Sequence, residues 1–262
     1  MSLAGHTDLE RELALAQRLA DAARPIALRY FRRTLAVEQK ADHSPVTVAD
    51  RTIETELRRL IRAEFPAHGI HGEEFDDQAG SEFTWVLDPI DGTKSYISGL
   101  PLFGTLIALL QEQQPVLGVM DMPALGERWV GRIGAPTLFN EHAARTSGYS
   151  RVAQARVYTT TPDEFDAADW RRFDTLSRRA ALRRFGGDCY SYGLLASGHC
   201  DLVVEARLKP HDFLVLPPII AGAGGRITDW NGAPLGLESD GHVVAAASES
   251  LLAEALEILT KQ

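Results

Sequence analysis

The 262-residue sequence predicts a layered α/β (α+β) fold, in which helices pack against an antiparallel sheet and a second lobe holds a mixed sheet between helices. Three observations support this class. Two stretches near the start carry apolar residues at helical spacing. Residues 101–133 alternate apolar segments with Gly, Pro and Gln breaks, and strand-like and helix-like segments alternate from Gln154. The change of pattern near 145–153 predicts two lobes, 1–148 and 149–262.

The N-terminal elements are predicted from capping and periodicity. Thr7-x-x-Glu10 is a capping-box pattern, so the first helix is expected to begin at Thr7 and to run to about Arg33. A short strand or turn is expected at 46–50, and a second amphipathic helix at about 51–64.

The C-terminal half is predicted to continue with an alternation and a long apolar helix. The predicted order from Gln154 is strand, helix, strand, helix, then an apolar helix, a strand and a terminal helix. These elements are expected at 155–160, 167–180, 187–198, 201–206, 212–223, 226–230 and 248–260.

Composition excludes several classes of function. The chain has 36 Asp and Glu against 27 Lys and Arg, so nucleic acid is not expected as a main partner. No apolar run approaches the ~20 residues of a membrane span, and the N-terminus lacks the apolar region of a signal peptide. Cys189 and Cys200 fit no zinc or disulfide pattern, so a cytoplasmic location is expected.

The most informative segment is WVLDPIDGTKSYISG, residues 85–99. Its apolar start reads as a buried strand that brings Asp88 and Asp91 into a turn bracketed by Pro and Gly. Two carboxylates held this close need a cation between them, or one must stay protonated. Oxygen ligands favour Mg²⁺, Ca²⁺ or Mn²⁺. A plain surface turn is the alternative for the two aspartates taken alone.

Three further acidic positions accompany this pair. Glu73 and Glu74 follow Gly72, Asp50 ends the 46–50 segment, and Asp212 begins the predicted apolar helix. Each also has a local interpretation. Asp50 and Asp212 could be helix caps, and Glu73 or Glu74 could be a solvated loop charge.

In combination these segments match a known family. HGEEF (71–75), WVLDPIDGTKSYISG (85–99) and KPHDFLVLPPIIAGAGGRITDWNG (209–232) resemble the inositol-monophosphatase-like, lithium-sensitive, Mg²⁺-dependent phosphatases. The resemblance runs from about residue 7 to 260. It implies an αβαβα sandwich, hydrolysis of a small phosphate monoester and a homodimer.

The resemblance also implies a metal centre. Carried over position by position, the ligands of two or three Mg²⁺ ions are the side chains of Glu73, Asp88, Asp91 and Asp212 and the backbone carbonyl of Ile90. Metal ions of this kind activate water and stabilise the leaving group in an in-line displacement.

Two residues are implied to act on water and others to hold phosphate. By resemblance, Thr93 pairs with Asp50 to orient and help deprotonate the attacking water. Gly92, Thr93 and Lys94 open a predicted helix whose free N–H groups can bind phosphate oxygens. Lys94 could add a positive charge or could be a solvated lysine.

Within the family, the segments 91–109 and 186–212 are more similar to the histidinol-phosphate phosphatases than to the inositol enzymes. Histidinol phosphate carries an ammonium and an imidazole, so its pocket should present carboxylates. Asp188 and Glu205 stand where the family's substrate-binding residues fall. A helix cap or an exposed strand residue is the alternative for each.

Two positions depart from the family pattern. His211 stands where Trp usually precedes the metal-binding Asp, and Gly222 replaces a usual acidic residue. Motifs of other phosphatases, NTPases, zinc proteases and serine hydrolases are absent. The sequence therefore predicts a histidinol-phosphatase of histidine biosynthesis. Phosphatases for inositol 1-phosphate, sugar phosphates or 3′-phosphonucleotides are the alternatives, and an inactive metal-binding regulatory protein is a remote one.

Overall fold

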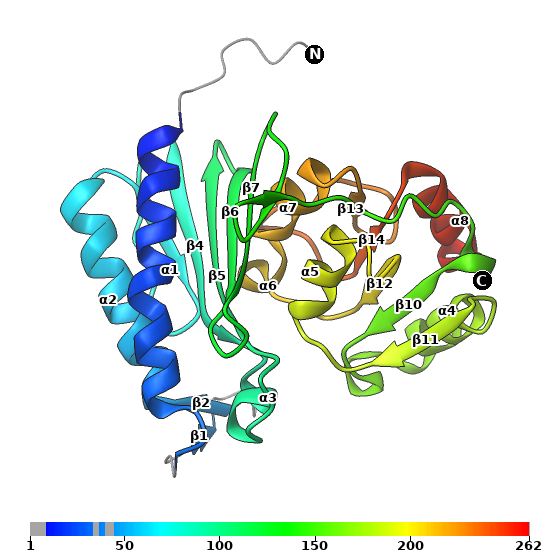
Figure 1. The fold of residues 1–262 in the computed structure, drawn as a ribbon, viewed down its shortest axis with the longest axis horizontal. Helices are drawn as coiled ribbons and strands as arrows, with labels where there is room; N and C mark the ends of the chain where they lie inside the picture. The colour runs from blue at the N-terminus through cyan, green and yellow to red at the C-terminus, as the bar shows by residue number, and fades with distance from the viewer. Residues whose placement is uncertain (1–8, 34–36, 40–44, 262) are drawn as a thin grey trace.

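The computed structural model describes residues 9–33, 37–39 and 45–261. Two sheets alternate with three layers of helices, which gives the αβαβα sandwich of Figure 1. The first sheet has the strand order β3-β4-β5-β6-β7-β8-β9 and is antiparallel except for the parallel pair β3–β4. The second has the order β11-β10-β12-β14-β13 and is mixed. The predicted fold class is confirmed.

The strands fall into these two sheets and one small ribbon. The first sheet contains β3 (Gly69–Gly72), β4 (Phe83–Asp91), β5 (Gly104–Gln111), β6 (Gln114–Met122), β7 (Glu127–Arg132), β8 (Leu138–Phe139) and β9 (His142–Ala143). The second contains β10 (Arg156–Thr159), β11 (Leu182–Phe185), β12 (Leu202–Glu205), β13 (Arg226–Thr228) and β14 (Val243–Ala246). The ribbon pairs β1 (Val37–Gln39) with β2 (Pro45–Thr47).

The helices cover the outer faces of the sheets and fill the space between them. They are α1 (Glu10–Tyr30), α2 (Val48–Glu64), α3 (Thr93–Ile97), α4 (Ala167–Ser177), α5 (Tyr190–Ala196), α6 (Pro210–Phe213), α7 (Leu216–Gly222) and α8 (Glu249–Thr260), with short 3₁₀ turns η1 (Val152–Gln154) and η2 (Pro162–Glu164). None of these helices combines the length and the apolar composition that a membrane crossing needs.

The period-2 pattern of the strands builds three cores. On β4, Trp85 and Leu87 pack toward α1 and α2, whereas Val86 between them packs into the middle layer with α5 and α7. On β12, Val203 faces the middle layer and Val204 faces the core formed with α4 and α8. The middle core joins residues of both sheets, so the division at 148/149 stays a prediction, although the change of sheet falls between β9 and β10.

The N-terminal helices differ in their starts from the prediction. Helix α1 begins at Glu10 after Leu9, which makes no side-chain cap, and it ends at Tyr30. Thr7, the predicted start, lies outside the described residues. Helix α2 begins at Val48, so Asp50 lies in its first turn.

Three assignments in the second half are wrong. Segment 187–198, predicted as a strand, contains α5, and 201–206, predicted as a helix, contains β12. The valine-rich β12 is buried on both faces, and such a run lacks the alternation that would distinguish it from a buried helix. The predicted helix 212–223 is two helices, because Pro217 and Pro218 begin a new helix rather than continue the old one. The strands β11 and β14 were not predicted.

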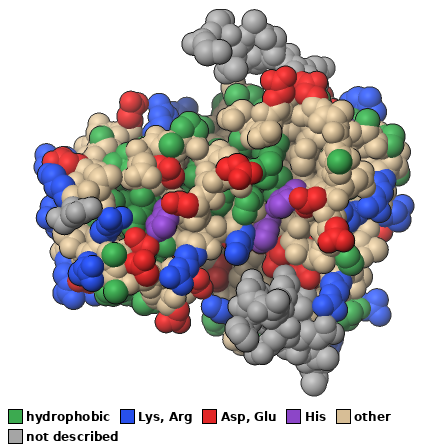
Figure 2. Space-filling model, turned by 180° about the vertical axis from the view of Figure 1, so that it is seen from behind, with side chains coloured by type: hydrophobic (Ala, Val, Ile, Leu, Met, Phe, Trp, Pro, Cys, Tyr) green, Lys and Arg blue, Asp and Glu red, His purple; other side chains and the backbone are tan. Residues whose placement is uncertain are grey.

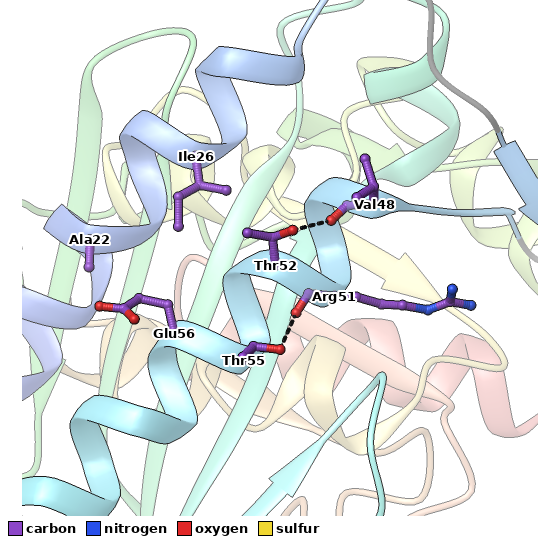
Figure 3. Close-up of a pocket in the computed structure, with 7 residues that line it drawn as sticks. All are labelled: Ala22, Ile26, Val48, Arg51, Thr52, Thr55 and Glu56. Atoms are coloured by element: carbon purple, nitrogen blue, oxygen red, sulfur yellow. Dashed lines mark hydrogen bonds between the residues drawn. The ribbon is translucent and has the colours of Figure 1, made fainter.

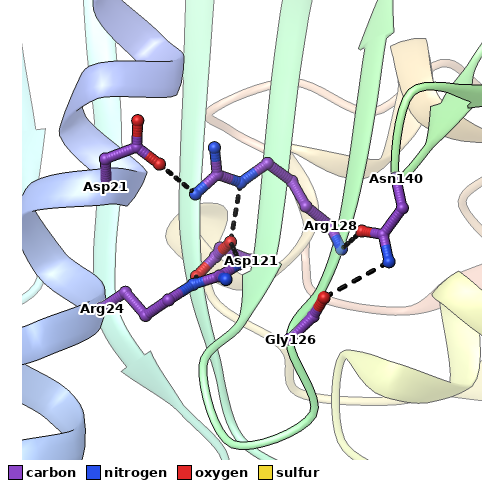
Figure 4. A network of polar contacts seen from close by, with 6 residues as sticks. All are labelled: Asp21, Arg24, Asp121, Gly126, Arg128 and Asn140. Atoms are coloured by element: carbon purple, nitrogen blue, oxygen red, sulfur yellow. Dashed lines mark hydrogen bonds and ion pairs between the residues drawn. The ribbon is translucent and has the colours of Figure 1, made fainter.

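A buried carboxylate ties α1 to the first sheet (Figure 4). Asp121 on β6 is fully buried and accepts hydrogen bonds from Arg24 of α1 at 2.5 and 3.1 Å and from Arg128 of β7 at 2.7 Å. Arg128 also donates to Asp21. Two guanidinium groups therefore balance the charge of this aspartate.

A surface groove lies between α1 and α2 (Figure 3). Two of its polar side chains form hydrogen bonds within α2: the Thr52 hydroxyl donates to the carbonyl of Val48, and the Thr55 hydroxyl donates to that of Arg51. The groove is lined by Ala22, Ile26, Val48, Arg51, Thr52, Thr55 and Glu56, and so by none of the predicted metal ligands.

Candidate metal centre

A bulge in β4 brings Asp88 and Asp91 to the same side of the strand. Side chains three residues apart on a regular strand point to opposite faces. Here the pairing with β5 shifts, because Asp88 lies opposite Leu106 and Asp91 opposite Gly104, so three steps on β4 match two on β5. The two aspartates thus converge from a continuous strand, and not from a turn beyond it as predicted.

The third carboxylate of this group, Asp212, comes from α6, which follows β12 in the sequence and packs against β4. Asp212 lies in the first turn of α6, where its Oδ2 accepts a hydrogen bond from the backbone N–H of Lys209 at 2.7 Å. One ligand atom from each of Asp88, Asp91 and Asp212 lies within 4.8 Å of the other two. A second group, formed by Glu73, Asp88 and His211, meets the same limit. The four predicted carboxylates therefore converge on one place.

The clustered negative charges of Asp88, Asp91 and Asp212 favour the binding of a cation. Asp88 is 2% exposed, and its Oδ1 is buried without a hydrogen-bond partner. Burial, followed by the charges of Glu73, Asp91 and Asp212, holds the pKa of Asp88 well above its usual range. Burial likewise raises the pKa of Asp91 and of Asp212. The oxygen donors of Asp88, Asp91 and Asp212, with a buried oxygen of Asp88 that lacks a hydrogen-bond partner in the described part of the chain, fit a hard divalent cation such as Mg²⁺.

The loop that carries Glu73 is braced from α2. The buried Glu54 accepts a hydrogen bond from Arg58 at 2.7 Å and another from the backbone N–H of Glu74 at 2.8 Å. Arg58 donates to the carbonyl of Phe75 at 2.9 Å. Sequence reasoning missed this brace. Its only signal was an acid and a base four residues apart on a helix.

Asp50 and Thr93, the predicted water-activating pair, are hydrogen-bonded to other residues and not to each other. Asp50 is at the third position of α2 and accepts hydrogen bonds from the backbone N–H and the hydroxyl of Thr47, so it completes a capping box. Burial raises the pKa of Asp50, and Glu73 adds to this effect. Thr93 donates its hydroxyl to the carbonyl of Ile90 at 3.1 Å. Pairing of Thr93 with Asp50 would need the Thr93 hydroxyl to leave Ile90, whereas Asp50 accepts both bonds from Thr47 on Oδ2 alone.

Asp188 lies beside the start of α3. It accepts a hydrogen bond from the Ser95 hydroxyl at 2.7 Å, and it also raises the pKa of Asp91. Gly92 has φ +78°, and a Cβ there would lie 2.8 Å from the carbonyl of Leu102 and 3.1 Å from Cγ of Asp188. Only glycine therefore fits between these groups. Exposed Lys94 lies 3.5 Å from Glu164, in agreement with a solvated lysine.

Glu205 is buried at the end of β12, next to β10. Its carboxylate accepts hydrogen bonds from the hydroxyls of Thr159 and Thr160 and from the backbone N–H of Thr160, at 2.8–2.9 Å. Burial raises its pKa to about 8. Neither of the two sequence-based alternatives, a helix cap or an exposed strand residue, describes this side chain. Contact with substrate stays a prediction.

Comparison with known proteins assigns the family. The model of the inositol monophosphatase family matches residues 8–261, and the chain belongs to this family of phosphatases. It is 42% identical to the chloroplastic bifunctional phosphatase IMPL2 of Arabidopsis thaliana, over 97% of this chain and 76% of that protein. It is 39% identical to a histidinol-phosphatase of Chlorobaculum parvum, over 89% of this chain and 92% of the other. The structure of an inositol monophosphatase from Zymomonas mobilis matches with a TM-score of 0.90 and 43% identity, covering 98% of this chain and all of that one.

Because Glu54 and Arg58 hold the Glu73 loop in place, we predict that Gly72→Ala weakens metal binding. A Cβ at Gly72 would lie 2.0 Å from Oε1 of Glu54 and 2.7 Å from Arg58, so the Glu73 loop must move. We expect about tenfold weaker Mg²⁺ binding by calorimetry. Gly236→Ala is the matched control, because its Cβ meets nothing within 4 Å. Equal affinity in the two variants would contradict the brace.

The raised pKa values predict a pH-dependent stability. In chelator, the free energy of unfolding should fall as pH rises from about 5 to above 8, because the folded state holds protons on Asp88, Asp91, Asp212 and Glu205 that the unfolded state loses near pH 4. Mg²⁺ should remove the part due to the aspartates. Glu205→Gln should reduce the part that remains, by the contribution of Glu205. Urea unfolding at about pH 5.5 and about pH 8.5 measures both, and a flat profile in chelator would refute the assignment.

Proposed function

We propose that this chain is a Mg²⁺-dependent phosphomonoester hydrolase that converts L-histidinol phosphate to L-histidinol in histidine biosynthesis. The main observation in support of a metal-dependent hydrolase is the convergence of four carboxylates, those of Glu73, Asp88, Asp91 and Asp212. One of their oxygens, Oδ1 of Asp88, is buried and has no hydrogen-bond partner among the described residues. The substrate is supported by the histidinol-phosphatases among the relatives, at 34–39% identity. It is also supported by the acidic residue Asp188 beside the carboxylates.

The carboxylates would hold two or three Mg²⁺ ions, with the carbonyl of Ile90 as a further ligand. When bound, such ions lower the pKa of water and neutralise charge on the phosphate. Thr93 and Asp50 would position the attacking water, and Asp50 would receive its proton, after the Thr93 hydroxyl leaves its present partner Ile90. The backbone N–H groups of Gly92 and Thr93, at the start of α3, would bind phosphate oxygens.

Asp188 would select the organic part of the substrate. A cationic amino alcohol gains charge-assisted hydrogen bonds in an acidic pocket, each contributing about 1.5–3 kcal/mol. Asp188 is held by Ser95, which leaves the rest of its carboxylate for a donor. Glu205 lies close enough for the charge of Asp188 to raise its pKa further, but it would have to exchange a threonine hydrogen bond for one from the substrate.

An inositol-1-phosphate phosphatase is the second candidate. The inositol monophosphatase of Zymomonas mobilis is as similar to this chain as the Arabidopsis relative is, at 43% identity. Sugar-phosphate and 3′-phosphonucleotide phosphatases are less favoured. An inactive regulatory protein is disfavoured, because all four carboxylates are present together. The free, buried thiols of Cys189 and Cys200 agree with the reducing cytoplasm that we propose, and a homodimer is proposed on resemblance.

A substrate panel tests this function. With Mg²⁺, phosphate release from L-histidinol phosphate should have the highest kcat/KM, compared with inositol 1-phosphate, fructose 1,6-bisphosphate and adenosine 3′,5′-bisphosphate. Asp188→Asn should lower kcat/KM for histidinol phosphate about ten- to a hundredfold and that for p-nitrophenyl phosphate much less. Asp91→Asn should abolish turnover of every ester.

Each outcome separates the parts of the proposal. A faster reaction with inositol 1-phosphate would refute the substrate and leave the hydrolase standing. Equal losses on both esters in Asp188→Asn would show that Asp188 supports the fold or the metals. Activity in Asp91→Asn, or in excess chelator, would refute the metal-dependent hydrolase.

A further inference from the structure

His211 lies beside two of the predicted metal ligands, Glu73 and Asp88. It directly precedes Asp212 in α6, and its side chain is 15% exposed. A ring nitrogen of His211 and carboxylate oxygens of Glu73 and Asp88 lie within 4.8 Å of one another. Two ligands that share one ion at about 2.1 Å are at most about 4.2 Å apart, so small side-chain rotations would close this set. Figure 2 shows acidic and histidine side chains lying among one another across the middle of one face.

Two contacts constrain the imidazole. Its Nε2 is 3.5 Å from Oδ1 of Asp212, which is longer than an N–H···O hydrogen bond, so the contact is an electrostatic one. Its ring is stacked with that of His71, at 6.5 Å between centroids, and His71 in turn meets Asp77 at 2.9 Å. His71 is thus engaged on the side of Asp77, and His211 lies with the carboxylates.

A second observation points to a ligand at this position. Asp88 belongs both to the group with His211 and to the group with Asp91 and Asp212, and its buried Oδ1 has no hydrogen-bond partner. A buried carboxylate oxygen without a donor is expected where a cation binds. The two groups share this residue, so they would form two neighbouring cation positions, one with oxygen donors alone and one with a nitrogen.

We propose that His211 supplies an imidazole nitrogen to the cation held by Glu73 and Asp88. The inference rests on the metal centre of the proposed function and extends it. Imidazole favours divalent transition metals over Mg²⁺, whereas carboxylates favour hard ions. The position beside His211 therefore prefers Mn²⁺ over Mg²⁺ more strongly than the position formed by Asp88, Asp91 and Asp212.

Electron spin-echo spectroscopy of the Mn²⁺-loaded full-length protein tests this directly. The wild type should show modulation from an imidazole ¹⁴N, replaced by that of ¹⁵N when only the histidines are labelled. His211→Phe keeps a ring but removes both nitrogens, so it should lose the modulation. It should also bind Mn²⁺ about tenfold more weakly while Mg²⁺ binding changes less. His71→Phe is the same change on the adjacent ring and should retain the modulation.

The outcomes distinguish this inference from the proposed function. Bound Mn²⁺ without histidine nitrogen coupling in the labelled wild type would overturn the role of His211, whether or not His211→Phe folds. Coupling that persists in His211→Phe and disappears in His71→Phe would overturn it as well. Nitrogen coupling in a protein that releases phosphate from no ester would support His211 and refute the proposed function. A wild type that binds no Mn²⁺ would refute both.

Discussion

Mutual repulsion among the clustered carboxylates of β4 and α6 is the constraint on which the site depends. The bulge in β4 turns Asp88 and Asp91 to one side, and α6, which packs against β4 in the layer between the sheets, adds Asp212. Nothing among these three side chains balances their charge, and burial raises the pKa of each. A cation at this point would join β4 of the first sheet to α6, because its ligands come from both.

The structure buries carboxylates in two contrasting ways. Asp121 lies between Arg24 and Arg128 and needs nothing from outside the chain. Glu54 is likewise matched by Arg58, and this pair fixes the loop of Glu73. Carboxylates paired with arginines thus stabilise the fold, whereas the group of Asp88, Asp91 and Asp212 has no such cation among the described residues and could bind one from outside the chain. This contrast is why perturbed, unpaired carboxylates indicate a functional site.

Sequence predicted the fold class and the convergent carboxylates, because the motifs around Asp88 and Asp212 keep their order and spacing and the strands alternate with period two. It could not predict the bulge, since the register of β4 depends on its neighbour β5. It assigned α5 and β12 wrongly, because short apolar segments carry no distinguishing period. It gave His211 only as a departure from the family pattern. Its place beside Glu73 depends on the packing of α6 against the first sheet, which no local pattern encodes.

The central claim is that divalent cations bind between the carboxylates of β4 and α6. Anomalous scattering from a crystal grown with Mn²⁺ locates such ions without any assumption about substrate. The account predicts a peak between Asp88, Asp91 and Asp212 and a neighbouring peak beside Glu73, with Oδ1 of Asp88 as a ligand. Peaks confined to the surface, with Asp88 protonated and hydrogen-bonded to its neighbours, would contradict it.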